Sequence, residues 1–185
     1  MIIRKSRWEK EESALLGVAG IYCRVWEEPP WNEDFWTIGR VIQDLHKELM
    51  KPNAVLLYAT EEEDREITGF TWGYETSISD LSDISGAFKS QWERIVGEKR
   101  AFYIDELGVD RKYRQCGFGL SLTQELLRKV TNLDIDYATL RTDIKAVAAR
   151  SLYKKMEFQE LSITDVEHPD RTYWLKDLKG KNSKK

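Results

Sequence analysis

Hydrophobic residues in the first fifty positions return every three or four residues, which is the period of an amphipathic helix. Residues 9–26 show this pattern, and Pro29 and Pro30 mark its end because a residue before proline disfavours the helical conformation. An acidic loop at 27–34 follows. Apolar positions then trace a second helix through Ile38, Val41, Ile42, Leu45 and Leu49. Two helices are therefore expected before any strand.

The pattern changes to short β-rich runs in the middle of the chain. Residues 54–60 and 67–75 flank a charged turn and predict an antiparallel hairpin. Residues 81–96 keep helical spacing and predict one continuous amphipathic helix. This helix has three interpretations that the sequence leaves open: a lid over an acceptor site, a dimer surface that would make the protein a homodimer, or extra packing.

The C-terminal half alternates strands and helices. The expected elements are a strand at 102–109, a glycine-bearing basic turn at 110–119, a helix at 120–130, a strand at 137–142, a helix at 146–155, and strands at 158–164 and 171–175. This order predicts a single mixed α/β domain, residues 1–178, with a central, mostly antiparallel sheet flanked by helices. Residues 179–185 are rich in lysine and are expected to form a disordered tail, because they have nothing apolar to dock.

Composition narrows the function classes. A chain of 185 residues with 41% hydrophobic residues buries enough surface to fold without disulfides or metal. The net charge of -3 argues against a nucleic-acid binder. Cys23 and Cys116 lie in unlike contexts, so neither a disulfide nor a zinc site is indicated and a reducing, cytoplasmic setting fits. No apolar run is long enough to span a membrane.

The strongest chemical signal lies where the strand at 102–109 runs into the turn and the next helix. At a helix N-terminus the first N–H groups lack internal partners and the helix dipole adds positive charge, so the turn can hold an anion. Gly117 and Gly119 allow close approach of the backbone, and Arg111, Lys112 and Arg114 add charge. The pattern is R-x-x-G-x-G, which fits neither a Walker loop nor a dinucleotide fingerprint.

Arg114-x-x-Gly117-x-Gly119 resembles the pyrophosphate-binding motif of the GNAT superfamily of N-acetyltransferases. Downstream, residues 149–158 resemble that superfamily's A-x-x-L-Y-x-x-x-G-F segment, and the order of elements also agrees. The resemblance implies an acetyl-CoA-dependent N-acetyltransferase that transfers the acetyl group directly to a primary amine in a ternary complex and releases coenzyme A, without a metal. The implied acceptor is a small molecule or a peptide, and the carboxylates and tryptophan of the acidic loop at 27–34 favour a cationic small molecule.

The resemblance also implies roles for individual residues. The amides of Gln115, Gly117, Gly119 and Leu120, in a loop that also contains Arg114, Cys116 and Phe118, would bind the pyrophosphate. Main-chain groups of Leu107 and Val109 would bind the pantetheine arm. Tyr153 would protonate the departing thiolate, and Glu106 or Asp105 would accept the amine proton, with Glu106 favoured for reach. Strand alternation suggests that only one of these two carboxylates faces a given side.

The acidic loop between the first two helices is the candidate acceptor site. Trp31 and Glu28 in this loop suit a cationic amine through cation–π attraction and charge. A solvated loop whose tryptophan caps the core is an equally good interpretation.

Two positions depart from the family pattern. Ala146 stands where Asn is common, and Glu157 stands where Gly is usual before Phe158. These departures support an alternative, a non-catalytic acyl-CoA-binding or regulatory module. A second alternative, a nucleic-acid binder that uses residues 111–114 and the lysine tail, conflicts with the overall acidity.

Overall fold

The computed structural model describes residues 1–7, 11–62, 66–97 and 99–179. The strands are β1 (Ile2–Lys5), β2 (Val55–Thr60), β3 (Ile67–Thr76), β4 (Ala101–Val109), β5 (Tyr137–Asp143), β6 (Gln159–Thr164) and β7 (Arg171–Asp177). The helices are α1 (Glu12–Glu27), α2 (Ile38–Leu49), α3 (Ile78–Ser85), α4 (Lys89–Val96), α5 (Phe118–Val130) and α6 (Val147–Lys155), with short 3-10 turns η1 (Arg111–Tyr113) and η2 (Thr131–Leu133).

The seven strands form one sheet in the order β1-β2-β3-β4-β5-β7-β6. The pairs β1–β2, β2–β3, β5–β7 and β6–β7 are antiparallel, and β4–β5 is parallel. The predicted single mixed α/β domain with a mostly antiparallel sheet is therefore confirmed. Within it the residues group into two compact units, Met1–Tyr74 with Asp105–Arg128, and Glu75–Ile104 with Lys129–Lys185.

The expectation that two helices precede any strand is wrong, because β1 comes first. Its four residues pair antiparallel with β2, from Ile2 opposite Thr60 to Lys5 opposite Leu57. The segment has two isoleucines followed by two basic residues and so shows no alternation of its own. Its strand conformation comes from backbone hydrogen bonds to an existing strand, which a sequence pattern does not encode.

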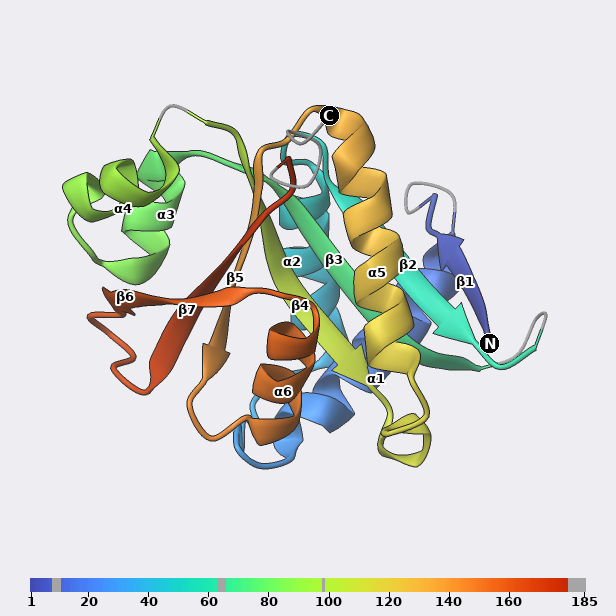
Figure 1. Ribbon diagram of the computed structural model, residues 1–185. Coiled ribbons are helices and arrows are strands. Elements are labelled where there is room, and N and C mark those ends of the chain that lie inside the picture. The colour runs from blue at the N-terminus through green and yellow to red at the C-terminus, as the bar shows by residue number, and fades with distance from the viewer. Residues whose placement is uncertain (8–10, 63–65, 98, 180–185) are drawn as a thin grey trace. The chain divides into compact units, whose positions relative to one another are not determined.

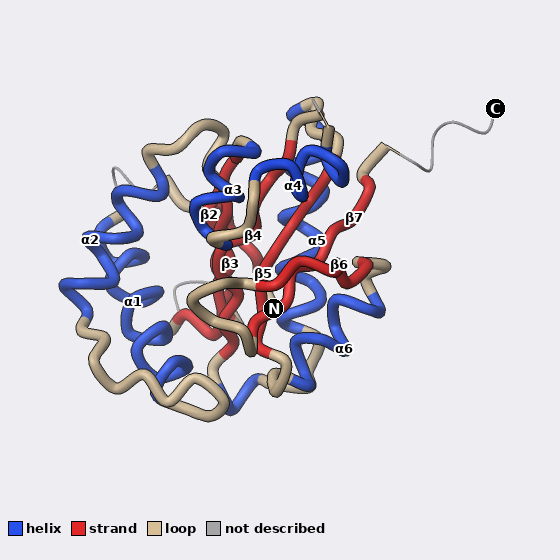
Figure 2. The backbone as a smooth tube through the Cα atoms, turned by 90° about the vertical axis from the view of Figure 1, so that its left-hand side faces the viewer, coloured by secondary structure: helices blue, strands red, loops and turns tan. Residues whose placement is uncertain are grey.

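In the first unit, helices cover both faces of the strands (Figures 1 and 2). Helices α1 and α2 pack against each other on one face, where they bury residues such as Val18 and Leu45 against Phe70 and Trp72 of β3. Helix α5 lies on the other face (Figure 1). A Cβ added to Gly69 of β3 would lie 3.2 Å from the Leu122 side chain, so α5 approaches the strand closely there.

In the second unit, the expected continuous helix over 81–96 is two helices. Gly86 ends α3 with φ +62, a left-handed conformation that interrupts a helix. Phe88, which the helical pattern assigns to the buried face, is 79% exposed and caps α4. Leu81 and Trp92, on either side of the break, are both buried, as the helical spacing of apolar residues predicted.

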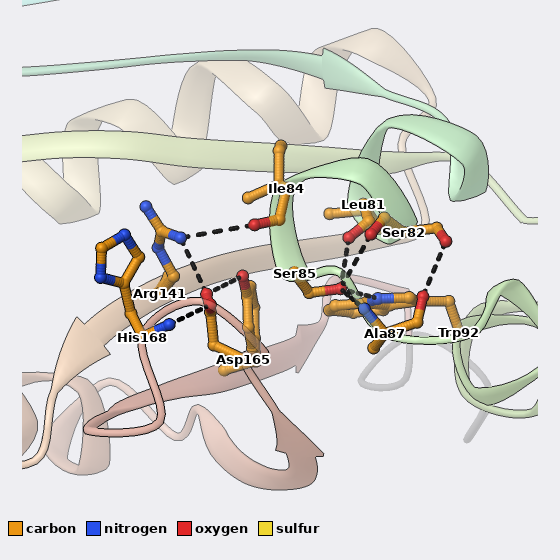
Figure 3. Close-up of polar contacts among 10 residues, drawn as sticks. Leu81, Ser82, Ile84, Ser85, Ala87, Trp92, Arg141, Asp165 and His168 are labelled. Carbon is orange, nitrogen blue, oxygen red and sulfur yellow. Dashed lines mark hydrogen bonds and ion pairs between the residues drawn. The ribbon is translucent and has the colours of Figure 1, made fainter.

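Polar contacts tie α3 and α4 to the rest of the second unit (Figure 3). The Ser85 hydroxyl accepts a hydrogen bond from the Trp92 indole at 3.0 Å. The Ser85 carbonyl accepts one from the Val166 N–H at 2.9 Å. Arg141 of β5 pairs with the buried carboxylate of Asp165 at 2.8 Å. Of the three interpretations of this segment, packing is therefore the one that these contacts support.

The first residue of the predicted disordered tail, Lys179, lies in the part of the chain that the structure describes. Its Nζ lies 2.8 Å from Asp134 and 3.0 Å from Asp136. Lys179 therefore does not behave as part of a detached tail. Residues 180–185 lie outside the described part of the chain.

Candidate functional site

The turn between β4 and α5 has the backbone geometry of an anion site. Gln115 (φ 63) and Gly117 (φ 85) are both left-handed, and the Gly117 carbonyl accepts the first helical hydrogen bond from Ser121 at 3.0 Å. A Cβ added to Gly117 would meet nothing within 4 Å, so the conformation and not packing requires glycine. The amides of Phe118, Gly119 and Leu120 open α5 and have no acceptor within the helix. Cys116 at the turn is exposed.

Arg114 and Glu28 are joined to each other. The Arg114 guanidinium donates to the Glu28 carboxylate at 2.6 Å and to the Val109 carbonyl at 3.0 Å. The structure thus brings a residue expected at the cofactor loop together with one expected at the acceptor loop. It also neutralises part of the positive charge that the sequence assigns to the turn.

The part of β4 that precedes the turn includes Leu107 and Val109. Parallel pairing of β4 with β5 runs from Ala101 to Ile104, so these two residues lie past the paired stretch. Between them, a Cβ on Gly108 would lie 2.5 Å from the Phe70 ring, which explains why glycine occupies this position. Leu107 and Val109 are therefore not paired with β5, and the Val109 carbonyl accepts the hydrogen bond from Arg114. Their role toward a pantetheine arm stays a prediction.

An aromatic cluster lies beside this half of β4 and consists of Tyr22, Trp26, Trp31, Trp36, Phe70 and Trp72. Tyr22 stacks on Trp26 with ring centroids 4.2 Å apart, and Trp31 stacks on the other side at 5.9 Å from Trp26. Trp31 is half-buried and packs against the core. The interpretation of this tryptophan as a cap on the core is therefore confirmed, and its role toward an acceptor stays a prediction.

Carboxylates line the aromatic cluster, and aromatic donors bind them. The Tyr22 hydroxyl donates to Glu106 at 3.2 Å, and the Trp36 indole donates to Glu33 at 2.7 Å. The Trp72 indole is within reach of both Glu48 (2.6 Å) and Asp105 (3.3 Å). Both Asp105 and Glu106 therefore contact the cluster, where alternation along β4 suggested that only one would.

Burial and like charge shift the titration of two groups here. Burial, and next the charge of Asp105, raise the pKa of Glu48 to about 9, so this carboxyl group is protonated at neutral pH. Burial, followed by the adjacent Glu106 carboxylate, raises the pKa of Tyr22 well above its ordinary value. The Tyr22 hydroxyl therefore acts as a hydrogen-bond donor over the physiological range.

Tyr153 belongs to the second unit. It lies on α6 with 6% of its surface exposed. The centroid of its ring lies 5.9 Å from that of Phe158 and 6.3 Å from that of Trp174. Ala146 caps α6 without a side-chain hydrogen bond. Glu157 adopts φ 63, the conformation that favours the glycine usual in this motif, and its carboxylate pairs with Lys176 at 3.2 Å. The altered turn is thus formed without glycine.

Sequence reasoning missed Tyr22, Glu48 and Trp72. A signal existed for Glu48, because it follows Val41 and Leu45 at the spacing that faces the core. A carboxylate at such a position requires a partner, and Trp72 supplies one. No comparable signal marks Tyr22, whose hydroxyl extends from an ordinary core position.

The described residues contain no group of three or more His, Cys, Asp or Glu side chains arranged to hold a metal ion. Among the helices formed by these residues, none is long and apolar enough to cross a bilayer.

The mixed sheet, with β4 running through a glycine turn into α5, defines a mixed α/β protein in which a helix N-terminus follows a central strand. Such a helix N-terminus can hold an anion. The model of the Acetyltransferase (GNAT) family matches residues 18–158, and the chain belongs to this family. The resemblance drawn from the two motifs is thus confirmed. No relative was found among curated protein sequences.

Solved structures of similar fold cover nearly the whole chain. A ribosomal-protein-alanine N-acetyltransferase from Brucella melitensis superimposes with a TM-score of 0.65 at 17% identity, covering 96% of this chain and 99% of that one. An aminoglycoside 6'-acetyltransferase type Ii gives 0.67 at 14% identity, with 96% and 97% covered. A chain of the NatC complex bound to Gag peptide and CoA gives 0.65 at 16% identity, with 95% and 97% covered. These similarities establish the fold.

Proposed function

We propose that the protein is an N-acetyltransferase that transfers the acetyl group of acetyl-CoA directly to a primary amine. The observation that carries the proposal is the turn from Arg114 to Leu120, where two left-handed residues precede the N-terminus of α5. The open space at the Cβ position of Gly117 suits a bulky anion such as a pyrophosphate. Family membership and a similar fold solved with CoA give independent support.

The residues of the first unit would divide the work as follows. The amides of Gln115, Gly117, Gly119 and Leu120 bind the pyrophosphate. Main-chain groups of Leu107 and Val109 orient the pantetheine arm. The bound thioester supplies the acetyl group. This arrangement uses backbone donors whose direction is fixed before the ligand arrives, which reduces the entropy lost on binding.

Proton transfer requires a base, because an ammonium must lose a proton before it attacks a thioester. Asp105 and Glu106 lie in the half of β4 that leads into the turn, beside the aromatic cluster. Its partly buried members, Trp31 and Trp36, are the rings that a cation would contact. A cationic small amine is the favoured acceptor. Peptide amines are the other class, since one similar chain was solved with a peptide. Tyr153 as the acid toward the thiolate rests on its place in the second motif.

The proposal predicts release of free thiol from acetyl-CoA when the correct amine is present. We expect one class in a panel of polyamines, aminoglycosides, amino acids and peptide N-termini to support turnover, followed with a thiol reagent. Tyr153→Phe should lower kcat by about 100-fold, in the range typical of general acid catalysis, with acetyl-CoA affinity unchanged.

The outcomes separate the alternatives. Binding of acetyl-CoA without thiol release for any amine would favour the non-catalytic module that Ala146 supports. Absence of acetyl-CoA binding would contradict both. An unchanged kcat for Tyr153→Phe would remove the tyrosine from the mechanism and leave the rest of the proposal in place.

A further inference from the structure

Glu48 places a carboxyl group on the face of α2 that packs against the core. Leu45 and Val41, one and two turns earlier on the same face, are 0% and 2% exposed. The Glu48 carboxylate accepts the Trp72 indole N–H at 2.6 Å, and burial is the largest cause of its raised pKa. A buried carboxyl group at this position is costly unless it is protonated or well bonded.

A second carboxyl group shares the same donor. Asp105 accepts from the Trp72 indole at 3.3 Å, and Glu48 and Asp105 are also within hydrogen-bonding reach of each other. One N–H group cannot balance two negative charges in adjacent positions. Retention of one proton between the two carboxyl groups removes this repulsion and supplies the missing hydrogen bond.

The charged groups around the pair do not alter this conclusion. The charge of Lys51, which follows α2, lowers the pKa of Glu48, but by less than burial and Asp105 raise it. The Lys51 ammonium lies over the Tyr74 ring, 3.6 Å from the centroid. On the α1 side, Tyr22 faces Glu106, and Glu33 and Asp105 add further negative charge. The surroundings are therefore predominantly acidic and favour the retained proton.

We propose that Glu48 is a positioning residue for Asp105: the two carboxyl groups share a single proton beside the Trp72 indole, and Asp105 is the carboxylate that accepts the amine proton. This inference rests on the proposed acetyl transfer. It assigns the base to Asp105 in place of Glu106, which the sequence favoured for reach, since the Glu106 carboxylate accepts a hydrogen bond from the Tyr22 hydroxyl.

The proton balance of the step is simple. An N–H bond of the acceptor ammonium breaks as an O–H bond forms on Asp105, which leaves a neutral amine and a pair that holds two protons. One O–H bond of the pair then breaks, and that proton passes to water. The pair returns to its singly protonated state before the next turnover.

Two nearly isosteric variants separate positioning from packing. In Glu48→Gln the amide NH2 group donates to Asp105 as the protonated acid does, whereas Glu48→Leu fills the space without a donor. A purely structural role predicts equal kcat for folded Gln and Leu variants, whatever the difference in their stability. Asp44→Asn is the matched control, since Asp44 lies on the same helix and pairs with Lys47 at 2.9 Å on the surface.

The first measurement is carboxyl carbon NMR of protein labelled at glutamate Cδ, with the Glu48 signal assigned by its loss in Glu48→Gln. We expect the Glu48 signal to titrate with a midpoint near 9 in wild type and in Asp44→Asn. A midpoint between 4 and 5, the ordinary range for glutamate, would overturn the shared proton.

The second measurement is kcat with the acceptor found by the thiol assay. We expect both Glu48 variants to be slower than wild type, with Glu48→Leu about tenfold below Glu48→Gln, as loss of a hydrogen bond to a charged group implies. Equal kcat values for these two variants, both folded by circular dichroism, would overturn the positioning role. The NMR titration does not need an acceptor, so failure of acetyl transfer would contradict the proposed function while the titration still decides the proton-sharing pair.

Discussion

Acidic side chains that are buried in this chain are held by specific donors, and Asp165 is the clearest case. With its side chain 1% exposed, it accepts hydrogen bonds from Arg141 at 2.8 Å, from the Tyr173 hydroxyl at 2.9 Å and from the His168 N–H at 2.8 Å (Figure 3). Removal of the Asp165 carboxylate leaves the half-buried Arg141 cation without its partner. The free-energy cost of that unpaired charge exceeds the net stabilisation that the ion pair provides.

Asp165→Ala should therefore lower the free energy of unfolding by about 3 kcal/mol in urea denaturation. Asp44→Ala removes an exposed carboxylate and should change the stability by less than about 0.5 kcal/mol. Equal effects of the two substitutions would show that the Asp165 contacts contribute nothing specific.

The Asp165 carboxylate also predicts that the protein loses stability as the pH becomes acidic. Although burial opposes it, hydrogen bonds from Arg141, His168 and Tyr173 lower the pKa of Asp165 in the folded state. Its contribution is then complete above the unfolded value near 3.9 and is lost as pH falls through the folded pKa. The stability difference between wild type and Asp165→Asn should shrink below about pH 4.

Residue-level prediction from sequence succeeded where a motif fixes the backbone. Arg114, Gly117 and Gly119 lie at a strand-to-helix turn as expected. It failed where two distant side chains meet, as in the Glu28–Arg114 pair and the shared contact of Glu48 and Asp105 with Trp72. Such contacts depend on how distant elements pack together, which a local sequence pattern does not predict.

At the scale of elements, hydrophobic period located most helices and strands within a few residues. Helix α2, strand β4 and the hairpin β2–β3 follow the pattern directly. The period missed β1, whose conformation depends on its neighbour, and it joined α3 to α4 across Gly86. A single left-handed residue breaks a helix without disturbing the spacing of apolar positions around it.

The break at Gly86 gives a prediction of its own. Gly86→Ala should destabilise the protein by about 1–2 kcal/mol, because a left-handed alanine is strained and its Cβ would lie 3.0 Å from Val166. Gly39→Ala is the matched control: a Cβ at this position in α2 meets nothing within 4 Å, so stability should rise by about 0.5 kcal/mol. Thermal unfolding of both variants checks the opposite signs.

At the scale of the whole molecule, the net charge of -3 divides into local sites of opposite sign. Basic residues gather at the turn before α5, and carboxylates gather around the aromatic cluster. The Arg114–Glu28 pair, at 2.6 Å, joins the two kinds of charge within the first unit. The family could be recognised from two short motifs because the turn before α5 is fixed by local backbone conformation, whereas the contacts of the aromatic cluster join side chains of several elements.

The central claim is that the turn at Gly117 binds acetyl-CoA, and calorimetric titration tests it most directly. We predict binding of one acetyl-CoA per chain to wild type and to the control Gly39→Glu, which adds the same side chain at an open position of α2. Gly117→Glu should weaken binding by at least about 100-fold, because it places bulk and negative charge at the proposed pyrophosphate position and strains a residue at φ +85. Undetectable binding to wild type, or equal affinity of wild type and a folded Gly117→Glu variant, would contradict the account.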